Sequence, residues 1–281
     1  MEAISPITLR KALTELDPAV SAPRASRPWH PFWLGSASVI VLLAAWQAVT
    51  AAGWIAPLFL PPPAAVAAKL VTLAGEGFMD ATLWQHAVAS LVRVALALLL
   101  ALATAIPLGL WMGLSPLARG LFDPLVEFYR PVPPLAYLPL IVIWFGIGEL
   151  SKVLLIALAI FAPVLIATAT GVRSVEPSRL RAAQSFGATR AQLLRHVVLP
   201  SALPDVLTGI RVGLGVGWST LVAAELVAAT RGLGFMVQSA AQFLNTDIVV
   251  LGIVVIATVA FTLELGLRAL QRRLVPWQGK P

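Results

Sequence analysis

Long apolar runs, separated by short basic or proline-rich stretches, dominate this 281-residue sequence. A helix needs roughly 20 predominantly apolar residues to cross the hydrocarbon core of a bilayer. Runs of this kind occupy residues 32–52, 86–114, 134–147, 152–172, 206–229 and 248–270. The third run is short and rich in proline, which makes its start the least defined. The pattern predicts an all-α membrane protein with six transmembrane helices.

The composition agrees with this pattern. Hydrophobic residues make up 59% of the chain and charged residues only 12%, with a mean hydropathy of +0.88. A soluble domain has about 25% charged residues, so lipid is the expected solvent for most of the surface. The sequence contains no cysteine, which excludes disulfides and thiolate metal sites.

Basic residues are distributed unevenly among the segments between the predicted spans. If both termini lie in the cytoplasm, the cytoplasmic segments carry fifteen Lys and Arg residues. The outer segments then carry three, namely Lys69, Lys152 and Arg231. This asymmetry follows the positive-inside rule. The net charge of +7 is therefore explained by membrane topology, and no nucleic-acid partner is expected.

The first residues of the chain differ from the rest. Residues 1–31 mix Pro, Ala, Ser and charged residues without a sustained period, and we expect them to form a mobile cytosolic tail. The charged leader is too long for a signal peptide, and the apolar run after it is long enough to span. Residues 32–277 are therefore expected to form one transmembrane domain.

One basic stretch, RAAQSFGATRAQLLRHVVLP, interrupts the apolar runs between the fourth and fifth predicted spans. Pro177 suits the first turn of a helix, and Gly187 can adopt the left-handed conformation that ends one. Thr189 and Gln192 have the spacing of a capping box that opens a second helix, which is expected to end at Pro200. Such a pair of helices either lies among the lipid headgroups or docks into the groove of a soluble partner.

The same stretch resembles the EAA signature of the permease subunits of binding-protein-dependent ABC importers. The residues that carry the resemblance, at the spacing of the signature, are Ala182, Ala183, Gly187, Val197, Leu199 and Pro200. The resemblance implies that a cytoplasmic loop, about residues 174–204, inserts a coupling helix into a cleft of an ATPase subunit. The family's leading glutamate is Arg181 in this chain. The contact made by that glutamate is therefore not expected, whereas the docking is.

A wider resemblance, to the branch of this family that imports taurine, alkanesulfonates and nitrate, covers about residues 54–277. It rests on four segments: FLPPP, GFMDATLWQH, YRPVPPLAYLPLIVIWFGIGE and GLGVGWSTLVAAELVAATRGLGFMVQSA. It implies the MetI-like, six-helix fold of type I ABC importers in a bacterial inner membrane, with taurine as substrate and alkanesulfonates or nitrate as alternatives. The implied partners are a second copy of the permease, two cytoplasmic ATPase subunits and a periplasmic substrate-binding protein.

The sequence offers no means of using ATP by itself. It lacks a Gly-rich phosphate-binding loop ending in Gly-Lys-Ser/Thr, so ATP is expected to bind another subunit. Its histidines, His30, His86 and His196, show neither metal-ligand spacing nor a Ser/His/Asp arrangement. No cofactor and no catalytic residue is therefore expected. The alternative to an ATP-driven importer is a secondary transporter of small anions or zwitterions. Such a transporter would need membrane-embedded carboxylates or ion sites in broken helices.

Arg93 lies within the second predicted span and Glu225 within the fifth. A charge at the bilayer centre costs about 2.5–3.5 kcal/mol on insertion scales, so both should face protein or water. They either form a structural pair or line the outer half of a transport pathway, where they would meet a substrate carrying a sulfonate and an ammonium. Tyr137, at the proline-rich start of the third span, is a further gate candidate.

Glycines are frequent inside the spans, for example Gly109 and Gly113 in the second and Gly213 and Gly217 in the fifth. Small residues let membrane helices approach closely. These positions therefore indicate either ordinary close packing or rocking between inward-open and outward-open states.

Overall fold

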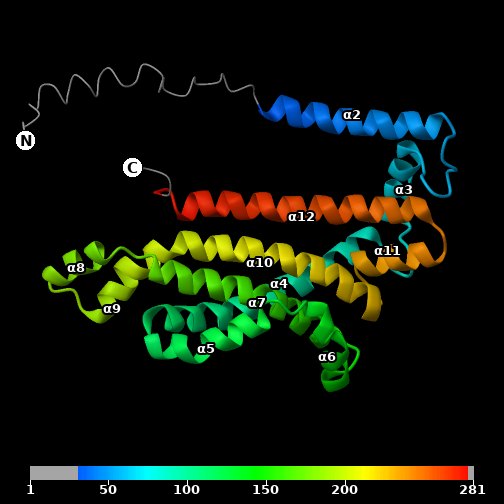
Figure 1. The fold of residues 1–281 in the computed structure, drawn as a ribbon. Helices are drawn as coiled ribbons and strands as arrows, with labels where there is room; N and C mark the ends of the chain where they lie inside the picture. The colour runs from blue at the N-terminus through cyan, green and yellow to red at the C-terminus, as the bar shows by residue number, and fades with distance from the viewer. Residues whose placement is uncertain (1–30, 278–281) are drawn as a thin grey trace, which may run out of the picture. The chain divides into compact units, whose positions relative to one another are not determined.

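The computed structural model describes residues 31–277, which are almost entirely helical (Figure 1). The chain divides into two compact units, residues 1–56 and 57–281. In the first unit the described residues form helix α2 (Pro31–Ala51), which matches the first predicted span within one residue at each end. The predicted cytosolic tail lies outside the described residues, apart from Pro31 at the start of α2.

The second unit contains all the other helices. Its described residues form no strand, and only an isolated bridge joins Phe78 and Ala81. In chain order the helices are α3 (Pro63–Gly75), α4 (Leu83–Leu114), α5 (Pro116–Tyr129), the 3-10 helix η1 (Pro134–Tyr137), α6 (Leu138–Phe145), α7 (Glu149–Arg173), α8 (Pro177–Ser185), α9 (Arg190–Leu193), the π-helix η2 (Leu194–Val198), α10 (Leu199–Ala228), α11 (Leu233–Gln242) and α12 (Thr246–Leu274).

Among the described residues, five helices are long and apolar enough to cross a membrane: α2, α4, α7, α12 and the continuous helix Arg190–Val227. A sixth span exists if α5 and α6, which are bent by 90° at their junction, cross as a pair. Helix α6 has 8 residues and is only about 12 Å long at 1.5 Å per residue. The third predicted span is therefore not one straight helix. Its predicted irregular start is confirmed, because the proline-rich stretch before α6 forms the turn η1.

The prediction that the helix ends at Pro200 is wrong. Helix α9 continues through η2 directly into α10, which begins at Leu199. In η2 the Leu199 N–H bonds to the Leu194 carbonyl, five residues back rather than four. This wider turn places Pro200 in the first turn of α10, where a residue without an N–H is tolerated. The chain thus accommodates Pro200 by a change of helix type before it, and the proline does not end the helix.

Helix α7 is the most buried of the candidate spans and packs along both α4 and α10 (Figure 1). Glycines on the neighbouring helices allow this approach. A Cβ added at Gly109 of α4 would lie 2.7 Å from the Thr168 side chain, and one added at Gly217 of α10 would lie 2.6 Å from Ile160. No side chain fits at such distances without movement, so the close-packing interpretation of these glycines is confirmed.

The packed helices have two distinct ends. At one end the chain leaves α7 at Arg173, forms α8 and α9, and returns into α10; we call this the loop end (Figure 1). At the other end lie the start of α7 and the turn from α10 into α11; we call this the α11 end. The environments of the charged side chains differ between these two ends.

Candidate functional site

At the α11 end, Arg93 of α4 pairs with Glu225 of α10. The Arg93 Nη1 lies 2.5 Å from Glu225 Oε1, and the Glu225 side chain is 0% exposed. The carboxylate also accepts hydrogen bonds from the Ser90 hydroxyl at 2.8 Å and from the Gly234 backbone N–H at 2.8 Å. Arg93 and Glu225 therefore form an ion pair, one of the two alternatives that the sequence left open, and each charge in it has several partners.

Two further charges, which the sequence reasoning did not select, complete this group. Glu149, the first residue of α7, accepts two bonds from the Arg93 guanidinium, at 2.5 and 2.8 Å. The same carboxylate accepts a bond of 2.9 Å from Lys152, one turn further along α7. We call Arg93, Glu149, Lys152 and Glu225 the ion cluster. The i, i+3 spacing of Glu149 and Lys152 was the available signal, but it does not show that Arg93 lies beside them.

The ion cluster holds the turn between α10 and α11. Arg93 Nη1 donates to the Arg231 carbonyl at 2.7 Å, and the Leu233 N–H donates to the Ser90 hydroxyl at 2.9 Å. The Gly232 N–H donates to His86 Nδ1 at 3.1 Å, so the Nε2–H of His86 is the donor to the Phe78 carbonyl at 3.0 Å. Gly232 has a φ of +139°, and the Glu225 carboxylate occupies the place of a side chain there. These groups are satisfied within the protein.

A second ion pair joins α10 to α12. Arg211 donates to Glu264 at 2.6 Å, and Arg268 donates to the same carboxylate at 2.7 Å. Glu264 and Arg268 are four residues apart on α12, whereas Arg211 comes from α10 and is brought to them by packing. This pair is half-buried and connects the outermost long helix of the second unit to its neighbour.

The loop end carries the predicted coupling residues. Gly187 has a φ of +78° and ends α8, while Thr189 and Gln192 form the predicted capping box of α9. At its base the loop is anchored by an apolar cluster of Val172, Val175, Val198 and Ala202. The loop is therefore a defined structure fixed to the ends of α7 and α10.

The tip of this loop is exposed. Phe186 is 92% exposed, and it borders a small hollow with Ala183, Gly187, Gln192 and Val197. The predicted coupling residues fall into two groups by burial: the exposed residues are Ala182, Gly187 and Leu199, and the half-buried residues are Ala183, Val197 and Pro200. Sequence reasoning placed Phe186 on an apolar helix face but did not select it as a site residue.

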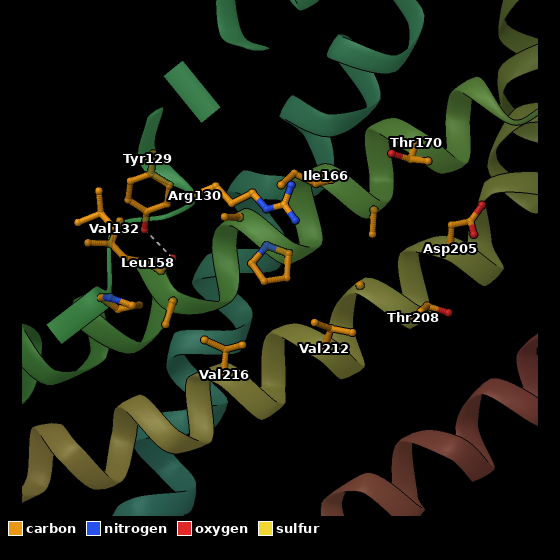
Figure 2. Close-up of a pocket in the computed structure, with 16 residues that line it drawn as sticks. Tyr129, Arg130, Val132, Leu158, Ile166, Thr170, Asp205, Thr208, Val212 and Val216 are labelled. Carbon is orange, nitrogen blue, oxygen red and sulfur yellow. Dashed lines mark hydrogen bonds between the residues drawn. The ribbon is translucent and has the colours of Figure 1, made fainter. Parts of the chain in front are cut away.

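Between the two ends, a groove of about 480 Å³ runs along α7 and α10 beside the end of α5 (Figure 2). Most of its lining is apolar, with Pro163, Ile166 and Val212 among the lining residues. The charged residues in the lining are Arg130 and Asp205, and Tyr129, Thr170 and Thr208 add hydroxyls. A concave apolar surface with a few polar groups is the usual form of a small-molecule site. The sequence did not predict this groove, because its lining comes from three separate segments.

Tyr137, the predicted gate residue, lies beside this groove. Its ring stacks on that of Tyr129, with centroids 5.7 Å apart, and the Tyr129 hydroxyl donates to the Leu158 carbonyl at 2.7 Å. Tyr137 also packs against the buried cluster of Leu138 and Ile141. The tyrosine pair thus fixes the bend between α5 and α6 to α7. By contrast, Arg93 and Glu225 are absent from the groove lining.

Comparisons with known proteins agree with this architecture. The family model described as "Binding-protein-dependent transport system inner membrane component" matches residues 105–276. The chain is 66% identical over 248 residues to the taurine transport system permease protein TauC of Escherichia coli K12, covering 88% of this chain and 90% of that protein. It is 37% identical over 241 residues to the putative aliphatic sulfonates transport permease protein SsuC of Bacillus subtilis 168, covering 85% of each.

Among solved structures, the chain is similar to one of the MetNI methionine ABC transporter in inward facing conformations, with a TM-score of 0.59 and 17% sequence identity. The match covers 66% of this chain and 93% of that chain. At this identity the similarity concerns the fold, which is the predicted all-α, MetI-type arrangement. The sequence relatives and the apolar helices agree with this fold and indicate a multi-pass inner-membrane protein. The chain belongs to the family of binding-protein-dependent transport system inner membrane components, the permease subunits of ABC importers.

Proposed function

We propose that the chain is the permease of a taurine importer. The observation that carries this proposal is the 66% identity to a taurine transport system permease over 88% of the chain. The identity to the putative aliphatic sulfonates permease of Bacillus subtilis is much lower, at 37%. Alkanesulfonates and nitrate are therefore the second choice of substrate.

The transport unit contains two copies of this chain, two ATPase subunits and one periplasmic substrate-binding protein. The groove supports the pairing of two copies, because it is not a closed channel within a single chain. The chain itself binds no nucleotide and needs no cofactor. The lack of a Gly-Lys-Ser/Thr loop in the sequence supports ATP binding by the separate subunits.

The loop end is the contact with the ATPase. A tip of small residues beside an exposed Phe186 suits insertion into a groove of a soluble protein. The EAA-like positions contribute in two ways. Ala182, Ala183 and Gly187 form the tip, whereas Val197, Leu199 and Pro200 connect it to α10. Movement of the ATPase would pass through η2 into α10, since the helix is continuous there.

The loop end is cytoplasmic, and so are both termini. The excess of Lys and Arg in the segments on that side supports this orientation. The ion cluster and α11 then lie toward the periplasm, where the substrate-binding protein docks. Membrane lipid surrounds the apolar outer faces of the helices.

The experiment measures ATP-driven uptake directly. The chain, its ATPase and its binding protein are reconstituted in proteoliposomes, and radiolabelled taurine uptake is measured with ATP present and the proton gradient collapsed. Uptake should persist and should require both ATP and the binding protein. A secondary transporter would instead lose uptake with the gradient. Transport of longer alkanesulfonates or nitrate without taurine would identify the second choice of substrate.

A further inference from the structure

We infer that Arg130 and Asp205 receive the two opposite charges of the substrate, Arg130 the sulfonate and Asp205 the ammonium, as the substrate passes along the groove. The inference rests on the proposed function and names the substrate contacts within it. It also moves the zwitterion site away from Arg93 and Glu225, where the sequence alone had suggested it.

The charges of the groove have little protein compensation. No ion pair or side-chain hydrogen bond joins the Arg130 guanidinium to another described residue, and that residue is exposed at the end of α5. Asp205 is half-buried on α10, and its carboxylate accepts one long bond, 3.4 Å, from the Ser174 hydroxyl. The groove therefore contains one cation, Arg130, without a partner among the described residues, and one anion, Asp205, with a single weak partner.

At two other places between the helices of the second unit, charged residues are paired within the chain. Arg93 and Glu225 have multiple partners, and Arg211 is paired with Glu264. Arg130 is exposed and Asp205 is half-buried, so neither is enclosed by the helix packing as Arg93 and Glu225 are. A pair of opposite charges left without compensation on one groove is best explained by a ligand or by water in a pathway.

The arrangement suits a zwitterion. In Figure 2 the Arg130 side chain lies over the α7 side of the groove near Ile166, and Asp205 lies further along toward Thr170. Apolar residues line the groove as well, including Ile166 and Val212. Taurine has an ammonium and a sulfonate separated by two methylene groups, so it carries one group for each of these charges and an apolar part for the wall. Charge-assisted hydrogen bonds of this kind are roughly twice as strong as neutral ones.

Asp205 also lies where movement of the loop end would reach it. A Cβ added at Gly171, near the end of α7, would lie 2.8 Å from the Asp205 Cβ, so α7 and α10 are in close contact at this point. The Ser174 hydroxyl that bonds to Asp205 belongs to the segment between α7 and α8. A shift of that segment would therefore change the position of the carboxylate in the groove.

The test compares variants of the full complex in proteoliposomes, with taurine as the probe and taurine transported per ATP hydrolysed as the readout. Asp205→Asn should lower this ratio about tenfold, since a hydrogen bond to a charged group contributes about 1.5–3 kcal/mol. Arg130→Gln should lower it similarly. Asp205→Glu should recover most of the ratio, because the charge is kept.

The matched control is Ser174→Ala, which removes the protein partner of Asp205 and keeps the carboxylate. Its ratio should stay near that of the wild type. Equal losses of uptake and ATP hydrolysis in Asp205→Asn and Ser174→Ala would overturn the inference in favour of a positioning role. Dissociation of the dimer by Asp205→Asn, with recovery in the charge-swapped Arg130→Asp/Asp205→Arg variant, would overturn it in favour of a contact between two copies.

Failure of the proposed function gives a different pattern. In that case the wild-type complex hydrolyses ATP but transports no taurine, and the inference falls with the substrate assignment. If the wild type transports taurine and both Asp205→Asn and Arg130→Gln keep its ratio, only the inference is overturned.

Discussion

The ion cluster at the α11 end and the loop at the other end are both rich in charge, yet they are built in opposite ways. In the ion cluster, Glu225 is fully buried and has three different donors, Arg93, Ser90 and Gly234. At the tip of the loop, Phe186 is 92% exposed. The first region completes its interactions within one chain, and the second exposes an aromatic side chain at its surface.

The difference indicates that the ion cluster holds the helices together, whereas the loop end contributes little to that packing. A buried charge is tolerated only with nearly complete compensation, so the ion cluster fixes the relation of α4, α7, α10 and α11. The exposed Phe186 and the small residues beside it make no internal contacts comparable to those of the ion cluster. The groove shares a property with each region. Its lining belongs to the packed helices, as in the ion cluster, but its charged side chains lack full compensation within the chain.

The largest expected effect comes from breaking the ion cluster. Glu225→Ala leaves Arg93 buried with one carboxylate partner fewer and should cost about 3–5 kcal/mol, the range found for broken buried ion pairs. The expected result is a large loss of folded, monodisperse protein, measured by thermal unfolding and size-exclusion chromatography in detergent. The matched control is Glu176→Ala, because Glu176 forms only an exposed pair with Arg179 at the loop end. Equal stability of the two variants would refute the contrast.

A smaller and different effect is expected from Gly187→Val. Nothing lies within 4 Å of an added Cβ there, but the φ of +78° strains any β-branched residue. The loop would relax out of the left-handed conformation, and restoring it for docking costs about 1–2 kcal/mol. This should reduce ATPase retention about 5- to 30-fold, while insertion and the packing of the spans stay unchanged. Co-purification of the ATPase measures this.

The control for that variant is Gly120→Val. Gly120 also has open space around it, but it lies within α5 and not at a positive φ. It should retain the ATPase. Normal retention and normal uptake in Gly187→Val would exclude a coupling role for the loop.

The smallest effect is expected from replacing Arg190 and Arg195 together by glutamine. Both are exposed at the loop end, and no ion pair joins either of them to another described residue. Exposed charges contribute little on their own, about 0–1 kcal/mol, so taurine uptake should change less than about threefold. A large loss of uptake with normal ATPase retention would instead favour the interpretation that this helix pair lies among lipid headgroups.

Much of the architecture follows from the sequence because it depends on local pattern. Apolar runs of spanning length predicted the long helices, and the first was correct to within one residue at each end. Capping chemistry predicted the turn at Gly187 and the start of α9 at Thr189, since both depend on a few neighbouring residues. The pairing of Arg93 with Glu225 was also predictable, because two opposite charges inside spans need each other.

Other features were decided only by tertiary structure. Glu149 and Lys152 join the ion cluster because α7 starts beside Arg93, and no local pattern contains that distance. The helix continues through Pro200 because η2 changes its hydrogen bonding. The groove brings Arg130 and Asp205 onto one surface from positions 75 residues apart. The sequence determines which segments are apolar, capped or charged, whereas packing decides which charges meet a partner within the chain and which remain for a ligand.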